Sequence, residues 1–545
     1  MDIINNKLLS DLEIHEKVIP IMDKTITSYG KTKFKELFQI MYFRENNLLR
    51  RREIILSILH NSKNSKKITI ELKKIKKMEK SIKWLFSTLG KEFKDLYFKH
   101  DNFNSKDLLS IKNLLKIYSP SLIIIVYFLI FMVLKYHGIN INIKDYFIGI
   151  YMSYKMFISG FLLLFTYNIN FISLLTNFLT TFYVLYQFYT IYNSVDTSII
   201  HYYKCNDFKK HIENIRCTLN YIKKIYKLDK FLKHEKLLIL DNIQYLDDMF
   251  SDDKISKFGY ELLLKKNYKD YENKFNNLLQ YIGLIDSFIN ISKLIIYKGY
   301  SFPIFDFNKK KGPYINANGL WSPYIYYEQV KNNCNLGIEN NPNTMILTGP
   351  NTSGKSTYIR NIMLSIFLAQ TLGITCCDNI VFTPFNSLFT YLDIPNISRQ
   401  RESLFEAEIH RCMEYCNILE SLSKNEFTFT VMDELLTSTS SNEGCATSFA
   451  FCEYLSQFPN SLNIVTTHFT ELTKLSQLYP DKFKNTRFTV IENDDGSFSR
   501  TYLIEEGKSY QNIAIKLLKQ KGYNNFFIDK ALLKLKELNK SDKYN

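Results

Sequence analysis

The sequence contains nine cysteines in 545 residues, yet it has no C-x-x-C pair. Cys376 and Cys377 are adjacent, and Cys412 and Cys416 lie one helical turn apart. Zinc sites and disulfide frameworks are built from regularly spaced cysteines, so this scatter argues against both and fits a reducing, intracellular compartment. The N-terminus is polar and charged, so it also lacks the pattern of a cleavable signal peptide.

No internal repeat is evident. At 545 residues the chain is too long for one ordinary domain, and two or three domains are expected. The net charge of +16 suits a polyanion such as DNA, or an anionic membrane surface. The chain is also rich in Lys, Asn, Ile and Tyr, as an AT-biased genome would produce, so the charge alone does not select DNA.

Charged residues are absent from Met156 to Val195, and Ser121 to Leu134 is continuously apolar. Because roughly 20 apolar residues span a bilayer, residues 117–195 have room for two membrane helices, near 117–137 and within 156–195. Tyrosines at the edges of the second run suit the membrane interface. Asn and Gln side chains interrupt the run, so a buried helical core is the alternative.

The remaining composition divides the chain further. Residues 1–116 have the pattern of charged helices, and residues 196–298 return to Lys- and Glu-rich helical periodicity. Turn-rich sequence begins near residue 300, so a boundary is placed near 299 and residues 299–545 form the last domain. A helix is expected over 524–538. An apolar stripe is expected on one face of the 196–298 helices, at Ile215, Leu219, Ile222, Ile225 and Tyr226.

A glycine loop lies near the start of the last domain. Residues 349–356 fit G-x-x-x-x-G-K-[ST], after an apolar run at 345–347 and before apolar positions at helical spacing. Strand, loop and helix are the context that this phosphate-binding motif requires. Lys355 would reach the β- and γ-phosphates of ATP, and the Ser356 hydroxyl would bind Mg²⁺. The expected nucleotide-binding residues are Gly349, Pro350, Asn351, Thr352, Ser353, Gly354, Lys355, Ser356 and Thr357.

A second apolar, β-branched run, residues 427–432, ends in Asp433 and Glu434. This pattern predicts a central strand with two carboxylates at its C-terminal tip. Asp433 would hold Mg²⁺ through water, and Glu434 would orient or deprotonate the attacking water. Acid pairs are common on solvated surfaces, but a pair that closes a hydrophobic strand downstream of a glycine loop indicates nucleotide hydrolysis.

Six segments occur in the order in which one ATPase family carries its motifs: 319–323 (GLWSP), 348–360 (TGPNTSGKSTYIR), 402–408 (ESLFEAE), 437–444 (TSTSSNEG), 466–472 (TTHFTEL) and 506–510 (EGKSY). They resemble the motifs of MutS, the mismatch-repair ATPase. Residues 23–30 (DKTITSYG) are similar to the start of the MutS core domain. The resemblance covers about residues 300–540 and, less specifically, 15–60.

The resemblance implies a fold and a mechanism. The fold is mixed: an α-helical core and lever region followed by an α/β P-loop NTPase domain of the ABC/MutS type. The active form is a dimer, most simply a homodimer, with two nucleotide sites at the interface between ATPase domains. Lys355, Glu434 and His468 would be catalytic, with His468 sensing the γ-phosphate. Ser403 would reach the γ-phosphate held by the other subunit, and hydrolysis would move the long helices.

The sequence also departs from the MutS pattern. The glycine-rich turn after the acids is Leu436-Thr437-Ser438 here, and the family's usual His before Pro323 is Ser322. The chain starts at the core domain, so a short form without the mismatch-reading and connector domains is expected. Phe34-Lys35-Glu36 matches the F-x-E mismatch wedge, but it lies in a core-domain helix, and we interpret the match as coincidence.

Three functions follow from these patterns. The first is a MutS-like DNA-binding ATPase that acts as an ATP-switched dimeric clamp in mismatch repair or related repair and recombination, with duplex or branched DNA as partner. The second is a membrane-anchored ATPase with a non-repair mechanical role, attached through 117–195 with its ATPase domain in the cytosol. A transporter ATPase of the ABC type is disfavoured, because the loop at Ser403 carries no L-S-G-G-Q.

Overall fold

A six-stranded sheet in the order β12-β11-β6-β10-β9-β8 organises the C-terminal half of the chain. The computed structural model describes all residues except 1, 4–5, 89–90, 140, 164–170, 252–256, 326–328, 338–340, 352, 393–403, 494–497, 510–514, 516–517, 520 and 542–545. The chain divides into two units. Unit 1 comprises Met1–Thr69, Asp229–Lys233 and Ile282–Asn545, and unit 2 comprises Ile70–Leu228 and His234–Tyr281.

The central strands of this sheet in unit 1 are parallel and fully buried. Every residue of β6, β9 and β10 is buried, as continuous apolar and β-branched runs require when helices cover both faces. The apolar runs at 345–347 and 427–432 are thereby confirmed as strands. The strands are β6 (Thr344–Thr348), β8 (Ser387–Tyr391), β9 (Thr428–Met432), β10 (Ser461–Thr466), β11 (Phe483–Glu492) and β12 (Phe498–Glu506).

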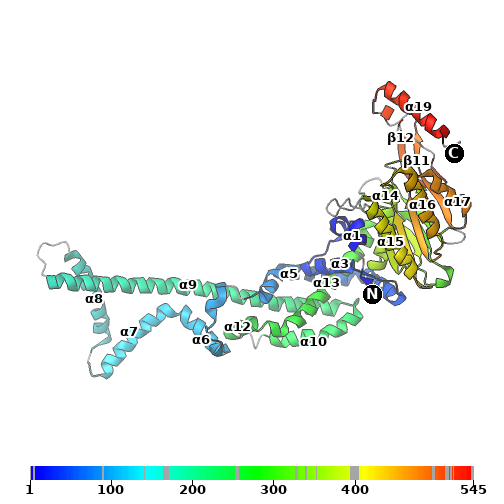
Figure 1. Cartoon of the computed structure of the whole chain (residues 1–545). Coiled ribbons are helices and arrows are strands. Elements are labelled where there is room, and N and C mark those ends of the chain that lie inside the picture. Colours follow the sequence, from blue (N-terminus) through cyan, green and yellow to red (C-terminus); the bar gives the residue numbers. More distant parts are fainter. Residues whose placement is uncertain are drawn as a thin grey trace. The chain divides into compact units, whose positions relative to one another are not determined.

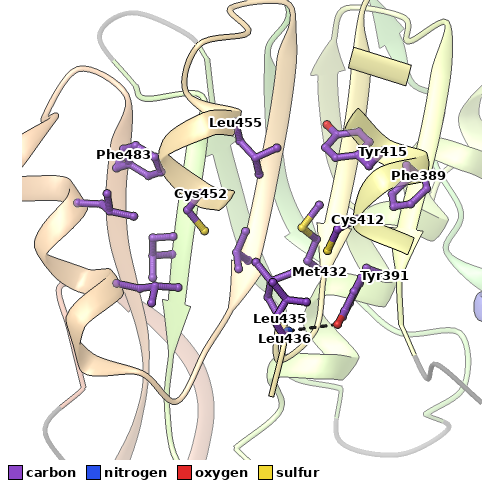
Figure 2. Close-up of a cluster of buried hydrophobic side chains, with 14 of the residues drawn as sticks. Phe389, Tyr391, Cys412, Tyr415, Met432, Leu435, Leu436, Cys452, Leu455 and Phe483 are labelled. Atoms are coloured by element: carbon purple, nitrogen blue, oxygen red, sulfur yellow. Dashed lines mark hydrogen bonds between the residues drawn. The ribbon is translucent and has the colours of Figure 1, made fainter. Parts of the chain in front are cut away.

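Helices pack against this sheet through a large apolar cluster (Figure 2). The helices in this cluster are α15 (Leu404–Ser421), α16 (Ser441–Leu455) and α17 (Leu475–Leu478), while α14 (Lys355–Thr371) contacts β9 and β10 outside it. In the cluster, Tyr415 of α15 and Cys452 of α16 are completely buried beside Met432 of β9. The mixed α/β class expected from the sequence is confirmed, and Figure 1 shows these helices beside the strands of unit 1.

A second, four-stranded sheet lies in unit 1, in the order β3-β7-β4-β5. Its strands are β3 (Ile304–Phe305), β4 (Ile315–Leu320), β5 (Asn332–Leu336) and β7 (Asn379–Phe382). The chain leaves β4 through 319–323, where the Trp321 N–H donates to the Cys376 carbonyl (3.0 Å). Toward the C-terminus, the helix expected over 524–538 is confirmed as α19 (Asn525–Ser541).

The N-terminal segment belongs to unit 1. It contains α1 (Asn6–Asp11), α2 (Ile19–Met22), α3 (Ser28–Leu37), α4 (Glu45–His60), and the two-stranded pair β1 (Asp2–Ile3) and β2 (Ile40–Met41). Phe38 stacks on Phe367 of α14 with ring centroids 6.3 Å apart, and the Gln370 side chain donates to the Tyr42 carbonyl (2.9 Å). The units therefore divide the chain differently from the ranges 1–116 and 299–545, because contacts distant in sequence join the two ends.

The segment at residues 23–30 docks the start of α3 onto α13 (Lys269–Lys298), whose residues from Ile282 onward belong to unit 1. The Asp286 carboxylate accepts the backbone N–H groups of Ile26 (2.9 Å) and Thr27 (2.7 Å), and the Thr27 hydroxyl (2.8 Å). The Thr27 hydroxyl in turn accepts the Gly30 N–H, which caps the helix. Burial raises the pKa of Asp286, and the Thr27 and Ile26 donors oppose that rise.

Unit 2 is helical throughout the residues described. It holds the greater part of α5 (Ser62–Phe86) and of α10 (Lys233–Met249), with all of α6 (Lys106–Ile117), α7 (Ser119–Tyr136), α8 (Ile143–Leu163), α9 (Phe171–Leu228) and α12 (Phe258–Lys266). The 58 residues of α9 form one helix of about 87 Å (Figure 1). The stripe expected on it is confirmed, since Ile215, Ile222 and Ile225 are completely buried.

Two helices are long and apolar enough to cross a membrane among the residues that the structure describes. The 18 residues of α7 have a mean hydropathy of 2.0, and only 6% of them are buried. The second, α13, is 72% buried, as the core helix of a soluble protein would be. The region 156–195, expected to hold one span, contains the end of α8 and the beginning of α9, and part of it lies outside the described residues.

Candidate nucleotide site

The loop between β6 and α14 has the geometry of an anion cradle. Gly354, the N-cap of α14, adopts φ 108°, a left-handed backbone conformation that residues other than glycine rarely adopt. A Cβ on Gly349 would lie 2.9 Å from the Ser353 hydroxyl and 3.0 Å from Phe488 Cβ, so this position also favours glycine. The N–H groups of the first turn of α14 have no carbonyl partner within the helix and suit a phosphate group.

Lys355 is the first residue of α14, and its side chain reaches back to the glycine loop. Its side chain is buried, and its ammonium group donates to the carbonyls of Gly349 (2.9 Å) and Pro350 (3.3 Å). Burial lowers the pKa of Lys355, while the carboxylates of Glu434 and Asp433 act in the opposite direction. Ser356 and Thr357 follow on the exposed side of the first turn, beside Asn351 and Gly354. Thr352 lies outside the described residues.

The two carboxylates follow β9 and are held by a residue that the sequence analysis did not single out. Thr466, the last residue of β10, accepts the Glu434 N–H at its hydroxyl (2.9 Å) and donates the same hydroxyl to Asp433 (2.5 Å). In the sequence, only its place in the segment 466–472 pointed to a role for Thr466, and that segment drew attention through its histidine. One buried hydroxyl thus fixes the backbone of one acid and the side chain of the other.

His468 lies against the second carboxylate. Its Nε2 is 2.6 Å from Glu434 Oε1, and this hydrogen bond, followed by the charge of Lys355, lowers the pKa of Glu434 despite partial burial. Glu434 adopts φ 49°, which is uncommon for a residue other than glycine and is typical of functional sites. The structure therefore brings together Lys355, Asp433, Glu434 and His468, as the sequence analysis expected.

A cavity of about 510 Å³ opens beside the glycine loop. Its apolar wall includes Leu320, Ile325 and Val330, and its polar wall includes Lys355, Ser356 and Glu434. Two buried polar atoms on its lining, the Ser322 hydroxyl and Asn361 Oδ1, have no protein hydrogen-bond partner. Apolar side chains for a base, a lysine for phosphates and unpaired polar atoms on one lining fit a nucleoside triphosphate.

The same residues fit a magnesium ion at the phosphate end. Ser356 is exposed beside the loop, and Asp433 is held by Thr466. Protein sites for Mg²⁺ supply few ligands, because the ion keeps several waters and binds phosphate oxygens. Among the residues that the structure describes, no three His, Cys, Asp or Glu side chains gather into a separate metal cluster.

The loop after the acids is fixed by the core although it lacks the family's glycines. Leu436 adopts φ 52°, is buried, and donates its N–H to the Tyr391 hydroxyl (3.2 Å), as Figure 2 shows. Ser438 donates its hydroxyl to the Glu408 carboxylate (2.8 Å). Glu408 belongs to the segment 402–408 and lies in α15, so its side chain joins that segment to the loop after the acids. Ser403 of that segment lies outside the described residues.

Comparison with known proteins gives this site a family context. Residues 345–539 match the family model of MutS domain V. The match contains the glycine loop, both carboxylates, Thr466 and His468, and it supports the resemblance to MutS. In the structure, Gly354, Lys355 and Glu434 line one cavity, and His468 is hydrogen-bonded to Glu434.

Curated relatives that carry the name DNA mismatch repair protein MutS are similar over about half of the chain. The protein of Persephonella marina is 26% identical over 328 residues, which cover 59% of this chain and 36% of the relative. That of Petrotoga mobilis is 29% identical over 271 residues, which cover 49% of this chain and 32% of the relative. The chain therefore spans about a third of the length of the relatives it matches.

Proposed function

We propose that this chain is a magnesium-dependent ATPase of the MutS type that works as an ATP-switched dimeric clamp on DNA, in mismatch repair or related repair and recombination. The observation that carries the proposal is that Lys355 and Glu434 line one cavity beside the glycine loop, with His468 hydrogen-bonded to Glu434. The family match over the same residues supports it.

In the proposed mechanism, Ser356 and Asp433 would hold a Mg²⁺ ion, which would supply positive charge against the phosphates. Lys355 supplies a second positive charge in a desolvated position, where electrostatic stabilisation is strong. Glu434 orients the attacking water or accepts its proton. Thr466 fixes the Glu434 backbone, and His468 keeps the Glu434 carboxylate ionised and oriented.

Two substitutions test the assignment of these roles. We expect Lys355→Ala to abolish ATP binding, because the buried cation beside the loop is lost. Glu434→Ala should bind ATP normally and lose turnover, which traps the ATP-bound dimer. The measurements are nucleotide binding by fluorescence titration and steady-state phosphate release. Normal turnover by the Glu434→Ala protein would exclude the carboxylate as base or orienter.

The dimer is a separate part of the proposal, and the segment around Ser403 motivates it. If Ser403 acts on nucleotide held by the other subunit, Ser403→Arg and Lys355→Ala proteins should complement each other when mixed. Each mixed dimer would then contain one geometrically complete site. ATPase activity measured against mixing ratio should rise to a maximum between the pure proteins. If the activity of each mixture is only the weighted average of the two pure proteins, Ser403 does not act across the interface.

Mismatch reading is not part of the proposal. Phe34, the aromatic residue of the F-x-E match, is completely buried in α3, with its ring edge-to-face to Phe38 at 5.3 Å. A residue that wedges between bases must be exposed, so this match is a coincidence of sequence. Sequence-independent contact with duplex or branched DNA is the form of binding that we propose.

A second candidate function is a membrane-anchored MutS-like ATPase, and the exposure of α7 favours it. Apolar residues occur on all sides of this helix, and most of them are solvent-exposed, including Val126, Ile130 and Met132. Its length of about 27 Å approaches the roughly 30 Å of a bilayer core. In soluble proteins a helix that is apolar on all sides is normally buried.

Topology distinguishes the anchored form from the soluble one. Within unit 2, His201 of α9 lies 2.9 Å from Asn113 of α6, so the segments before α7 and after residue 196 share one compartment. The number of complete membrane crossings between them is therefore even, and we propose two. Tags inserted near Lys66 and near Lys209 should both be cytosolic. Labelling on opposite sides would contradict this topology, and extraction by carbonate without detergent would favour the soluble form.

A further inference from the structure

Unit 2 contains a second cavity, of about 750 Å³, near the beginning of α7. Its lining is strongly basic and aromatic: Lys94, Lys99, His100, Lys112 and Lys116 with Tyr97, Phe98, Phe103 and Asp95. Asp95, the single acid among these residues, lies 3.3 Å from Lys204 and is neutralised by it. The cavity therefore presents several lysines without a matching number of carboxylates, which suits an anionic ligand.

The walls of this cavity are held by buried polar contacts. Asn113 of α6 donates its amide to the Leu96 carbonyl (3.0 Å), which ties α6 to the 3₁₀ helix η2 (Lys91–Leu96). Lys112 donates to the Tyr97 carbonyl and lies over the Phe98 ring at 4.7 Å. Two of the four lysines thus project from a helix that is fixed in place, so the basic lining is a defined part of unit 2.

The positive charge extends to the residue that joins α6 to α9. The pKa of His201 is lowered to about 4, first by burial and then by the charges of Lys116, Lys204 and Lys112. The other charged groups near His201 are Lys209, Asp207 and Asp95. Three lysines that add to the effect of burial on this one histidine are a sign of unbalanced positive charge, which a bound anion would relieve.

An apolar surface lies directly beside these lysines. On α6, Leu108, Ile111 and Leu115 are 42%, 53% and 50% exposed and share one helical face. Lys112 and Lys116 flank that face, and α7 continues the apolar surface from residue 119. A helix with an exposed apolar face edged by lysines is the pattern of a helix that lies in a membrane interface.

We propose that this cavity binds the head group of an anionic phospholipid, while α7 and the apolar face of α6 enter the acyl region of the same bilayer. The inference rests on the membrane-anchored candidate function and adds a lipid class and a site to it. Duplex DNA would also offer phosphates to the lysines. It would leave the adjoining apolar face in water, so the combination of surfaces favours lipid.

The test compares two lipids on the full chain in mild detergent, using native mass spectrometry to titrate bound phosphatidylglycerol and phosphatidylcholine. Wild-type protein should bind phosphatidylglycerol at least about tenfold more tightly, because each lysine near an anionic lipid surface contributes appreciably. The variant Lys99→Glu/Lys116→Glu should lose most of that preference and keep its weak phosphatidylcholine binding. Its helical circular dichroism and ATPase activity should be unchanged.

A matched control makes the same change in charge elsewhere in unit 2. Lys73 and Lys77 are exposed on α5 and do not line the cavity, so Lys73→Glu/Lys77→Glu should leave the lipid preference intact. Equal binding of the two lipids by the wild-type protein would overturn the head-group site while leaving membrane anchoring standing. An equal loss of preference in the control would overturn it too.

Competition separates lipid from other anions. Millimolar inorganic phosphate and a 20-base-pair duplex are added in turn to the phosphatidylglycerol complex. Retention of the lipid against both is the expected result. Displacement by phosphate would show a site for free phosphate, and displacement by the duplex would assign the lysines to DNA; either overturns the proposal. Carbonate extraction of cells that express the protein tests the membrane-anchored candidate function independently.

Discussion

Glu434 shows how single residues control the site. Its left-handed backbone, its hydrogen bond to His468 and its N–H bond to Thr466 are three separate restraints on one carboxylate. Strain of this kind persists only where the surrounding structure compensates for it. The restraints fix where a water-activating carboxylate lies and keep it ionised at physiological pH.

Removal of the histidine should change the pH dependence of hydrolysis. The His468 hydrogen bond is the largest influence that lowers the pKa of Glu434. In a His468→Ala protein the pKa of Glu434 should rise, so the carboxylate is protonated at higher pH as the solution is acidified. We expect the acidic limb of the profile of kcat/KM against pH to move upward. The exposed His410 on α15 provides the control, since His410→Ala should leave that limb unchanged.

Thr466 is expected to act as a positioning residue. Thr466→Val keeps the shape of the side chain but removes the hydroxyl that joins Asp433 to the Glu434 backbone. We expect kcat to fall by about tenfold to a hundredfold, which corresponds to one lost hydrogen bond of about 1.5–3 kcal/mol to a charged group. ATP affinity should change little. Thr371→Val, which removes a buried hydroxyl bonded to the Phe367 carbonyl (2.7 Å), should leave kcat unchanged.

At the scale of elements, α3 and α13 explain why the segment 23–30 ends in glycine. Asp286 of α13 accepts the N–H of Thr27, the N-cap of α3, and a Cβ on Gly30 would lie 2.3 Å from the Asp286 carboxylate. On α13, a Cβ on Gly283 would lie 2.6 Å from the Tyr29 carbonyl. Two glycines thus permit a close approach of helices whose contact joins residues far apart in sequence.

Replacement of Gly30 should therefore destabilise unit 1. Gly→Ala in a helix normally stabilises by about 0.5–1 kcal/mol. For Gly30→Ala we expect the opposite sign, a loss of about 1–3 kcal/mol, because the methyl group displaces a buried, hydrogen-bonded carboxylate. Urea unfolding in a Trp84→Phe background measures this, since Trp321 then reports on unit 1 alone. A stabilised Gly30→Ala protein would contradict the packing argument.

At the scale of the whole molecule, the net charge of +16 supports a prediction about DNA. If binding rests on phosphate contacts, affinity should fall by on the order of 10³ between about 50 and 200 mM salt for about six contacts. Sequence should matter little, because phosphate contacts carry no base information. A single mismatch should change the binding free energy by less than about 1 kcal/mol, below the roughly 1–3 kcal/mol of a base-specific contact.

Fluorescence anisotropy across a salt series, with and without ATP, measures this on homoduplex, mismatched and four-way junction DNA. Junction DNA should bind best, because it offers more phosphates to a clamp. A strong preference for the mismatch would reveal a recognition element elsewhere in the protein. Binding that lacks any salt dependence would instead favour the membrane-anchored function.

The sequence by itself determined the local parts of this protein. The strands at 344–348 and 428–432, the glycine loop and the apolar stripe on α9 could all be predicted, because each rests on a short run of residues whose periodicity or backbone freedom allows one structure. The approximate positions of Lys355, Asp433, Glu434 and His468 followed from their places at the ends of those elements.

Only the tertiary structure decided how distant residues meet. The hydroxyl of Thr466 between two acids, the hydrogen bond from Thr27 to Asp286 and the Tyr391 contact to Leu436 each join segments that no local pattern relates. The assignment of residues 1–69 to the unit of the nucleotide site likewise depends on long-range packing such as Phe38 on Phe367. The tertiary structure also distinguished α7 from α13. Both helices are long and apolar enough to cross a membrane, but α7 is largely exposed and α13 is largely buried.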